Sequence, residues 1–126
     1  ALSLGFRMEY KGKTVVYATD SEISEDPDIA SVNEKNVGNL IKNADVLIAD
    51  CQYTKNEYES KIGWGHTSIE KVVEISNTYN VKNLFAFHHD PLRTDEQVDI
   101  MLYNANHLVK PPLKLYGARE KTTIYL

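Results

Sequence analysis

The chain has 126 residues and a net charge of −4 at pH 7, with 42% hydrophobic and 25% charged residues. This acidic balance excludes the chain-wide basic field of a non-specific nucleic-acid or membrane binder. No apolar run approaches the roughly 20 residues of a membrane-spanning helix. Cys51 is the only cysteine, which excludes an internal disulfide and favours a reducing, cytoplasmic location.

The first predicted elements form a β-hairpin. Residues 4–10 and 13–19 are short runs rich in Val, Tyr, Phe and Thr, separated by a Lys-Gly dipeptide. A two-residue connection with glycine suits a tight turn, because glycine adopts positive φ without a steric penalty. Asp20 ends the second strand, and the polar, acidic residues 21–32 predict a surface loop.

Three helices are predicted from their starting residues. In a capping box, a Ser or Thr side chain accepts a hydrogen bond from the backbone N–H three residues later, where a Glu or Gln side chain bonds back. Apolar residues with helical spacing follow each candidate pair. The three pairs are Ser31 with Glu34, Thr67 with Glu70, and Thr94 with Gln97.

The remaining elements are strands. DVLIAD (45–50) and NLFAFH (83–88) are near-continuous apolar runs, which are typical of strands covered on both faces. LKLYG (113–117) and TTIYL (122–126) predict two closing strands. The order therefore predicts an α/β fold with helices packed on a mixed sheet, and residues 1–126 form a single unit.

Polar side chains follow the predicted strands. Asp20, Asp50 and His88 each stand at the carboxyl end of a strand, and His66 lies just before the helix predicted to open at Thr67. Strand carboxyl ends share one edge of an open α/β sheet, so these side chains are expected to meet. Carboxylate and imidazole are suitable ligands for zinc, manganese or iron. Two ligands are too few, however, because a catalytic zinc usually has three from protein.

Four blocks of sequence carry a resemblance to a known family. They resemble the carboxyl-terminal half of metallo-β-lactamase-fold hydrolases, in the branch similar to ribonuclease Z and the cyclic-phosphate phosphodiesterases. The resemblance runs through residues 4–126 in order and implies half of an αββα sandwich. The blocks are GFRMEYKGKTVVYATDSE, ADVLIADCQYTKNEYESKIGWGHTS, LFAFHHDP and GAREKTTIYL.

The resemblance also implies roles for individual residues. Asp20 resembles the metal ligand that bridges two ions, and His88 resembles the last ligand. His66 resembles a non-ligand histidine that assists the leaving group of a phosphodiester, and Asp50 resembles the acidic residue that orients it. The implied cofactor is a pair of divalent ions, zinc first and manganese or iron as alternatives, which supplies the attacking hydroxide.

One departure from the family is large. Its His-x-His-x-Asp-His motif is absent, because no two histidines here stand two residues apart, and the chain opens abruptly at Ala1. We therefore expect this chain to be the carboxyl-terminal half of an enzyme. Its partners would be the missing amino-terminal half and a phosphodiester or other small-molecule substrate. The segment alone would bind metal weakly or not at all, would be inactive, and would self-associate through its exposed face.

Two further residues are predicted to bind substrate. His89 follows His88 and points to the opposite face, because side chains alternate along a strand. It is expected to line the rim of the site. Trp64, between two glycines, is expected to wall the site. The alternative for Trp64 is a loop anchor packed on the core.

Simpler interpretations exist for each site residue. A histidine that ends an apolar strand is commonly structural, an aspartate after a strand is commonly a turn residue, and His66 could satisfy backbone groups before a helix. DVLIAD also resembles the phospho-acceptor strand of receiver domains, but no acidic pair follows the first apolar strand and no late strand ends on lysine. The alternative function is a non-catalytic interaction or regulatory module with the same half-fold.

Overall fold

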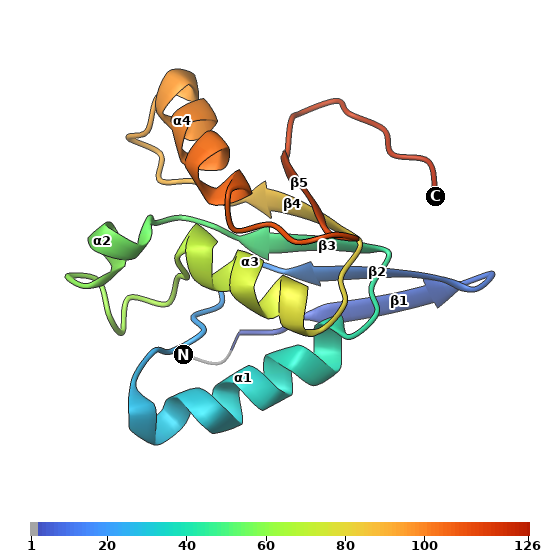
Figure 1. Ribbon diagram of the computed structural model, residues 1–126, viewed down its shortest axis with the longest axis horizontal. Coiled ribbons are helices and arrows are strands. Elements are labelled where there is room, and N and C mark those ends of the chain that lie inside the picture. The colour runs from blue at the N-terminus through green and yellow to red at the C-terminus, as the bar shows by residue number, and fades with distance from the viewer. Residues whose placement is uncertain (1–2) are drawn as a thin grey trace.

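A mixed five-stranded sheet forms the centre of the molecule. The computed structural model describes residues 3–126 (Figure 1), and the strands follow sequence order across the sheet. The first pair is antiparallel, and the other neighbouring pairs are parallel. The strands are β1 (Phe6–Tyr10), β2 (Lys13–Ala18), β3 (Val46–Asp50), β4 (Asn83–Phe87) and β5 (Lys114–Gly117).

The turn of the β1–β2 hairpin has the predicted form. Lys11 has φ 47° and Gly12 has φ 75°. Positive φ at both central residues is the signature of a type I′ turn, whose twist matches that of the flanking strands. The predicted hairpin is confirmed.

Four helices connect and cover the strands: α1 (Pro27–Ile41), α2 (Lys55–Tyr58), α3 (Ile69–Thr78) and α4 (Asp95–Asn106). Helix α1 begins earlier than predicted, because Asp26 is its cap and accepts a hydrogen bond from the Asp28 N–H at 3.0 Å. The prediction of a cap at Ser31 is therefore wrong, and the predicted loop over 21–32 is confirmed only for residues 21–26. An Asp followed by Pro at the first helical position is the stronger start signal.

The other helix starts agree with the sequence to different degrees. The Thr94–Gln97 capping box of α4 is confirmed. Ser68 rather than Thr67 caps α3, since the Thr67 hydroxyl bonds to another loop. The short helix α2 was not predicted, although Thr54 forms a capping box at its start.

The core lies between the sheet and the long helices. Buried residues Val16, Leu47 and Leu84 stand on β2, β3 and β4, and they belong to one cluster with Ile41 of α1, Val72 of α3 and other apolar side chains. In Figure 1, α3 lies in front of the central strands, with α1 and α4 on either side of it. All three long helices therefore cover the same face of the sheet.

The opposite face of the sheet is apolar and open. One row of strand-pairing partners crosses all five strands. Phe6 is 57% exposed and Tyr116 is 41% exposed, although both are large apolar side chains. Phe87 of β4 lies on this face and is 39% exposed, so the prediction that β4 is covered on both faces is wrong. On β3 every residue except the half-buried Ile48 is buried, which agrees with the prediction. We call this row the open face: Phe6, Tyr17, Ile48, Phe85 and Tyr116.

The carboxyl-terminal end differs from prediction. Residues 114–117 form the expected strand β5, but residues 122–126 form no strand and are exposed. A strand requires a neighbour for its backbone hydrogen bonds, and β5 is the last strand of this sheet. None of the helices in residues 3–126 combines the length and apolar character needed to cross a membrane.

Candidate metal centre

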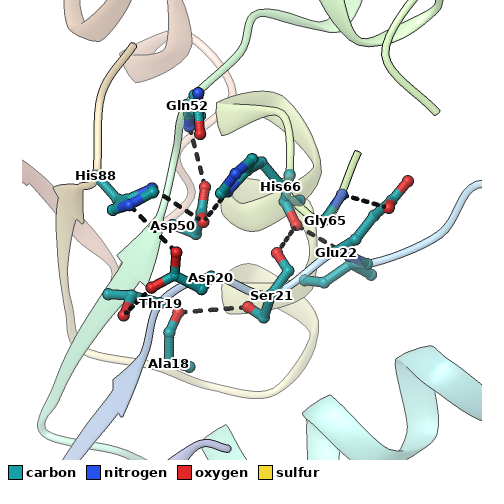
Figure 2. Close-up of polar contacts among 12 residues, drawn as sticks. Ala18, Thr19, Asp20, Ser21, Glu22, Asp50, Gln52, Gly65, His66 and His88 are labelled. Atoms are coloured by element: carbon teal, nitrogen blue, oxygen red, sulfur yellow. Dashed lines mark hydrogen bonds and ion pairs between the residues drawn. The ribbon is translucent and has the colours of Figure 1, made fainter. Parts of the chain in front are cut away.

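Two side chains at strand ends face each other. Asp20 lies just beyond β2 and His88 directly follows β4, with φ values of 49° and 56°. This left-handed conformation costs a non-glycine residue of the order of 1–3 kcal/mol, so the surrounding structure must maintain it. Nε2 of His88 lies 3.3 Å from Oδ1 of Asp20 (Figure 2). The expected proximity of these two residues is therefore observed.

Asp50, the last residue of β3, lies beneath both histidines. Its side chain is 1% exposed, and its Oδ2 is 2.8 Å from Nδ1 of His66 and 3.4 Å from Nδ1 of His88. The His88 contact is electrostatic, since Nδ1 of His88 makes no aligned hydrogen bond with any of the described residues. Oδ1 accepts from the Gln52 N–H at 3.3 Å. Burial raises the pKa of Asp50, and the hydrogen bond with His66 opposes this rise.

The contact with Asp50 determines how His66 presents its ring. An ionised carboxylate can only accept, so Nδ1 of His66 donates and Nε2 remains available on the other side of the ring. The His66 ring stacks on that of His88, with centroids 4.9 Å apart and planes inclined by 27°. Asp50 therefore orients His66 toward the edge where Asp20 and His88 meet.

Asp20, His66 and His88 fit a divalent metal ion. Each offers one ligand atom, and these atoms all lie within 4.8 Å of one another. Two donors bound tetrahedrally to one zinc ion are about 3.4 Å apart, from bond lengths of about 2.1 Å. The 3.3 Å between His88 and Asp20 is close to that separation. One carboxylate and two imidazoles suit zinc, manganese or iron.

The four residues predicted to meet at this edge do so, and the structure adds one feature to the prediction. His66 was expected to be a non-ligand, yet it lies within ligand distance of Asp20 and His88. The direction of an imidazole in a loop has no sequence signal, because it depends on how the loop folds back on the sheet.

The two predicted substrate-binding residues lie in different places. Trp64 is 63% exposed and lines a pocket with Asp20, next to the metal site. Nζ of Lys61 lies 4.0 Å above its ring. His89 lines another pocket, beside Asp95 and other residues near the start of α4 and the end of β5. Both nitrogens of the His89 ring are buried, and within residues 3–126 neither has a hydrogen-bond partner.

Glu22 and Thr67 were missed by the sequence analysis. The side chain of each forms hydrogen bonds that join the loop after β2 to the loop before α3. The only sequence signals were a carboxylate two residues after Asp20 and a hydroxyl directly after His66.

The fold and this edge define an α/β protein with a candidate site for a divalent metal. The sequence matches the family model described as the beta-lactamase superfamily domain over residues 1–89. The chain therefore belongs to the beta-lactamase superfamily.

A solved structure supports the same fold. The metallo-beta-lactamase fold protein YhfI from Bacillus subtilis is 17% identical in sequence, with a TM-score of 0.67. The similarity covers 91% of this chain and 40% of that one. The present chain thus matches less than half the length of that protein. No curated protein matches the chain in sequence.

Proposed function

We propose that the protein acts as a metal-dependent hydrolase of the phosphodiesterase type. The observation that carries this proposal is the convergence of Asp20, His66 and His88, with ligand atoms within 4.8 Å, at one edge of the sheet. Membership of the superfamily supports metal-dependent hydrolysis in general. Bound divalent ions, zinc first and manganese or iron as alternatives, would supply hydroxide near neutral pH and stabilise a leaving oxygen.

In this proposal, the residues of the site have separate roles in metal binding, proton donation and substrate contact. Asp20 presents a largely exposed carboxylate and His88 a half-buried imidazole, and both hold metal. Asp50 holds Nδ1 of His66 and so directs Nε2 toward the site, where it would donate a proton to the departing oxygen. Trp64 lies beside Asp20 in the adjoining pocket, where it contacts substrate.

We propose that a further segment completes the domain by covering the open face. Even if His66 is counted, three ligand side chains are too few for two metal ions. The open face carries large exposed aromatic rings, and the similarity covers only 40% of the solved structure. The segment would be the other half of the same domain and would bring the remaining ligands. We also propose a cytoplasmic location, because the single cysteine, Cys51, is free and buried.

The second candidate function is a non-catalytic interaction module. The number of ligands favours it, since the described residues bring only three potential metal ligands together. In that case the open face would be the functional surface, and the metal site would be a remnant.

Removal of the metal distinguishes the proposed hydrolase from the proposed interaction module. The complete natural chain that carries this sequence is expected to contain zinc or manganese and to hydrolyse bis-p-nitrophenyl phosphate. Chelation should abolish hydrolysis and re-addition of the ion should restore it, because the ion supplies the nucleophile. Elemental analysis and absorbance assays provide the measurements. A complete chain that holds no metal and cleaves no phosphodiester would favour the interaction module.

A substitution at His66 tests its predicted role. If Nε2 donates a proton to the leaving oxygen, His66→Gln should slow hydrolysis of an alkyl phosphodiester by about 100-fold or more. It should slow a p-nitrophenyl ester much less, because p-nitrophenolate departs without a proton. Metal content should not change. A loss of metal in His66→Gln would instead identify His66 as a ligand.

The exposed aromatic rings predict self-association of the 126-residue segment. Sedimentation velocity is expected to show dimers or larger species at high concentration, since burying the open face removes apolar surface from water. Phe6→Glu should shift the distribution toward monomer. Ile29→Glu, at a similarly exposed residue of α1, is the matched control and should not. A monomer at all concentrations would contradict the prediction.

A further inference from the structure

The loop that carries His66 is held by a carboxylate from another part of the chain. Oε1 of Glu22 accepts hydrogen bonds from the Tyr58 hydroxyl and the Gly63 N–H, both at 2.7 Å. Oε2 accepts from the Gly65 N–H at 2.9 Å (Figure 2). The two glycines flank Trp64 and have φ values of 86° and 91°, a region that other residues rarely adopt. Glu22 therefore fixes the backbone directly before His66.

The side chain of Thr67 joins the same two segments, the loop after β2 and the loop before α3. Glu22 reaches from the first segment to the second, and Thr67 reaches from the second to the first. The Thr67 hydroxyl donates to the Ser21 carbonyl at 2.6 Å and accepts from the Ile23 N–H at 2.9 Å. Thr67 is 1% exposed, so no water replaces these bonds. Ser21 and Ile23 are the two neighbours of Glu22 in the chain. The bonds of Glu22 and Thr67 thus alternate across the gap between the segments.

These contacts lie directly beside the candidate metal ligands. Asp20 precedes the first segment by one residue, and His66 lies within the second. In the part of the chain that the structure describes, no hydrogen bond joins Asp20 to His66. Asp50 holds the two histidine rings, and the bonds of Glu22 and Thr67 hold together the two backbone segments that carry Asp20 and His66. We propose that Glu22 and Thr67 are positioning residues that set the distance between the metal ligand Asp20 and the proton donor His66. This inference rests on the metal site proposed above.

The chemistry of both side chains suits this role. An ionised carboxylate offers acceptor positions on both oxygens, and all three donors that approach Glu22 use them. A glutamine would present an NH₂ group, which accepts nothing, to one of the glycine amides. The Thr67 hydroxyl uses its donor and an acceptor position at the same time. Valine has nearly the same shape but leaves both backbone partners unpaired.

The test uses four variants of the complete natural chain. Glu22→Gln and Thr67→Val each remove hydrogen bonds between the two segments. Thr67→Ser keeps the hydroxyl, and Thr94→Ala weakens the remote cap of α4 as a control for general loss of stability. Trp64 is the only tryptophan of this sequence, so the assays use a chain in which any other tryptophan has been replaced by phenylalanine. The fluorescence anisotropy of Trp64 then reports on the loop.

Clear differences are expected among the variants. In Glu22→Gln and Thr67→Val, hydrogen exchange at the Gly63 and Gly65 amides should accelerate by about 10–100-fold. Trp64 anisotropy should fall, and kcat for an alkyl phosphodiester should fall by about tenfold or more while KM changes little, because the proton donor is displaced. kcat for bis-p-nitrophenyl phosphate should fall much less, because p-nitrophenolate departs without a proton. Thr67→Ser should resemble the natural chain in every readout.

Two outcomes would overturn the proposal. One is an unchanged kcat for the alkyl phosphodiester in variants whose Gly63 and Gly65 amides exchange rapidly, because the hydrogen bonds of Glu22 and Thr67 would then not position His66. The other is a loss of kcat for this substrate no greater than in Thr94→Ala. A natural chain that binds no zinc overturns the proposed function itself, which the unsubstituted protein reveals before any variant is compared.

Discussion

Replacing His88 by alanine in the complete natural chain is expected to lower metal affinity by more than about 100-fold. Loss of an outer partner of a ligand already costs roughly 10–100-fold, and His88 itself presents Nε2 3.3 Å from the Asp20 carboxylate. The substitution also removes the ring that stacks on His66. Hydrolysis of bis-p-nitrophenyl phosphate should fall to background. Elemental analysis after gel filtration, together with initial rates, measures both effects.

His107→Ala is the matched control for this experiment. His107 is the residue that ends α4, and its Nδ1 bonds to the Tyr103 carbonyl at 3.0 Å. It is exposed and lies outside the candidate metal site, so the variant should retain metal and activity. The His88 variant should keep its fold, because His88 is about one-third exposed at the end of β4. Unchanged metal content and rates in His88→Ala would rule out the proposed centre.

The proximity of Asp20 and His88 could be predicted because it follows from topology. Side chains that end parallel strands share one edge of the sheet, and the apolar runs before Asp50 and His88 identified those strands. The hairpin was equally predictable, since its turn needs positive φ and the sequence offers Lys11-Gly12. These features depend on local residue types and on strand order alone.

Features that depend on competition between neighbouring residues were not predictable. Thr67 and Ser68 are both capable of capping α3, and the burial of Thr67 against Ser21 and Ile23 leaves the cap to Ser68. Similarly, the apolar runs of β3 and β4 show that both faces are apolar, but they do not show what covers each face. The position of the Glu22 carboxylate also depends on how two distant loops meet.

Replacing Asp50 by asparagine is expected to affect function and stability in opposite directions. Asparagine has the same shape but no charge, so it holds His66 and the proposed metal ligand His88 less firmly. Metal affinity and hydrolysis should fall by about 10–100-fold in the complete natural chain. The metal-free protein should nevertheless become more stable at neutral pH, because burial makes the ionised form of Asp50 unfavourable and raises its pKa.

The sign of the pH dependence follows from this raised pKa. An unfolded aspartate ionises near pH 3.9, whereas Asp50 in the folded protein retains its proton to higher pH. Between the two values the folded state binds more protons, so the stability of the natural protein falls as pH rises. Asp50→Asn lacks this dependence. Its stability advantage in urea unfolding should therefore be smallest below about pH 4 and grow as the pH is raised.

Asp45→Asn is the matched control, for which the opposite change in stability at neutral pH is expected. Hydrogen bonds from Lys82 Nζ and the Thr14 N–H, both at 2.8 Å, lower the pKa of Asp45. Its ionised form stabilises the fold above the ordinary pKa of aspartate, and this contribution disappears as pH falls through the lowered value. Asp45→Asn should therefore lose stability at neutral pH and leave metal affinity unchanged. If both variants lost stability at neutral pH, the contact between Asp50 and His66 would stabilise the fold more than burial of the carboxylate opposes it. Asp50 would then be a structural anchor as well as the residue that orients His66.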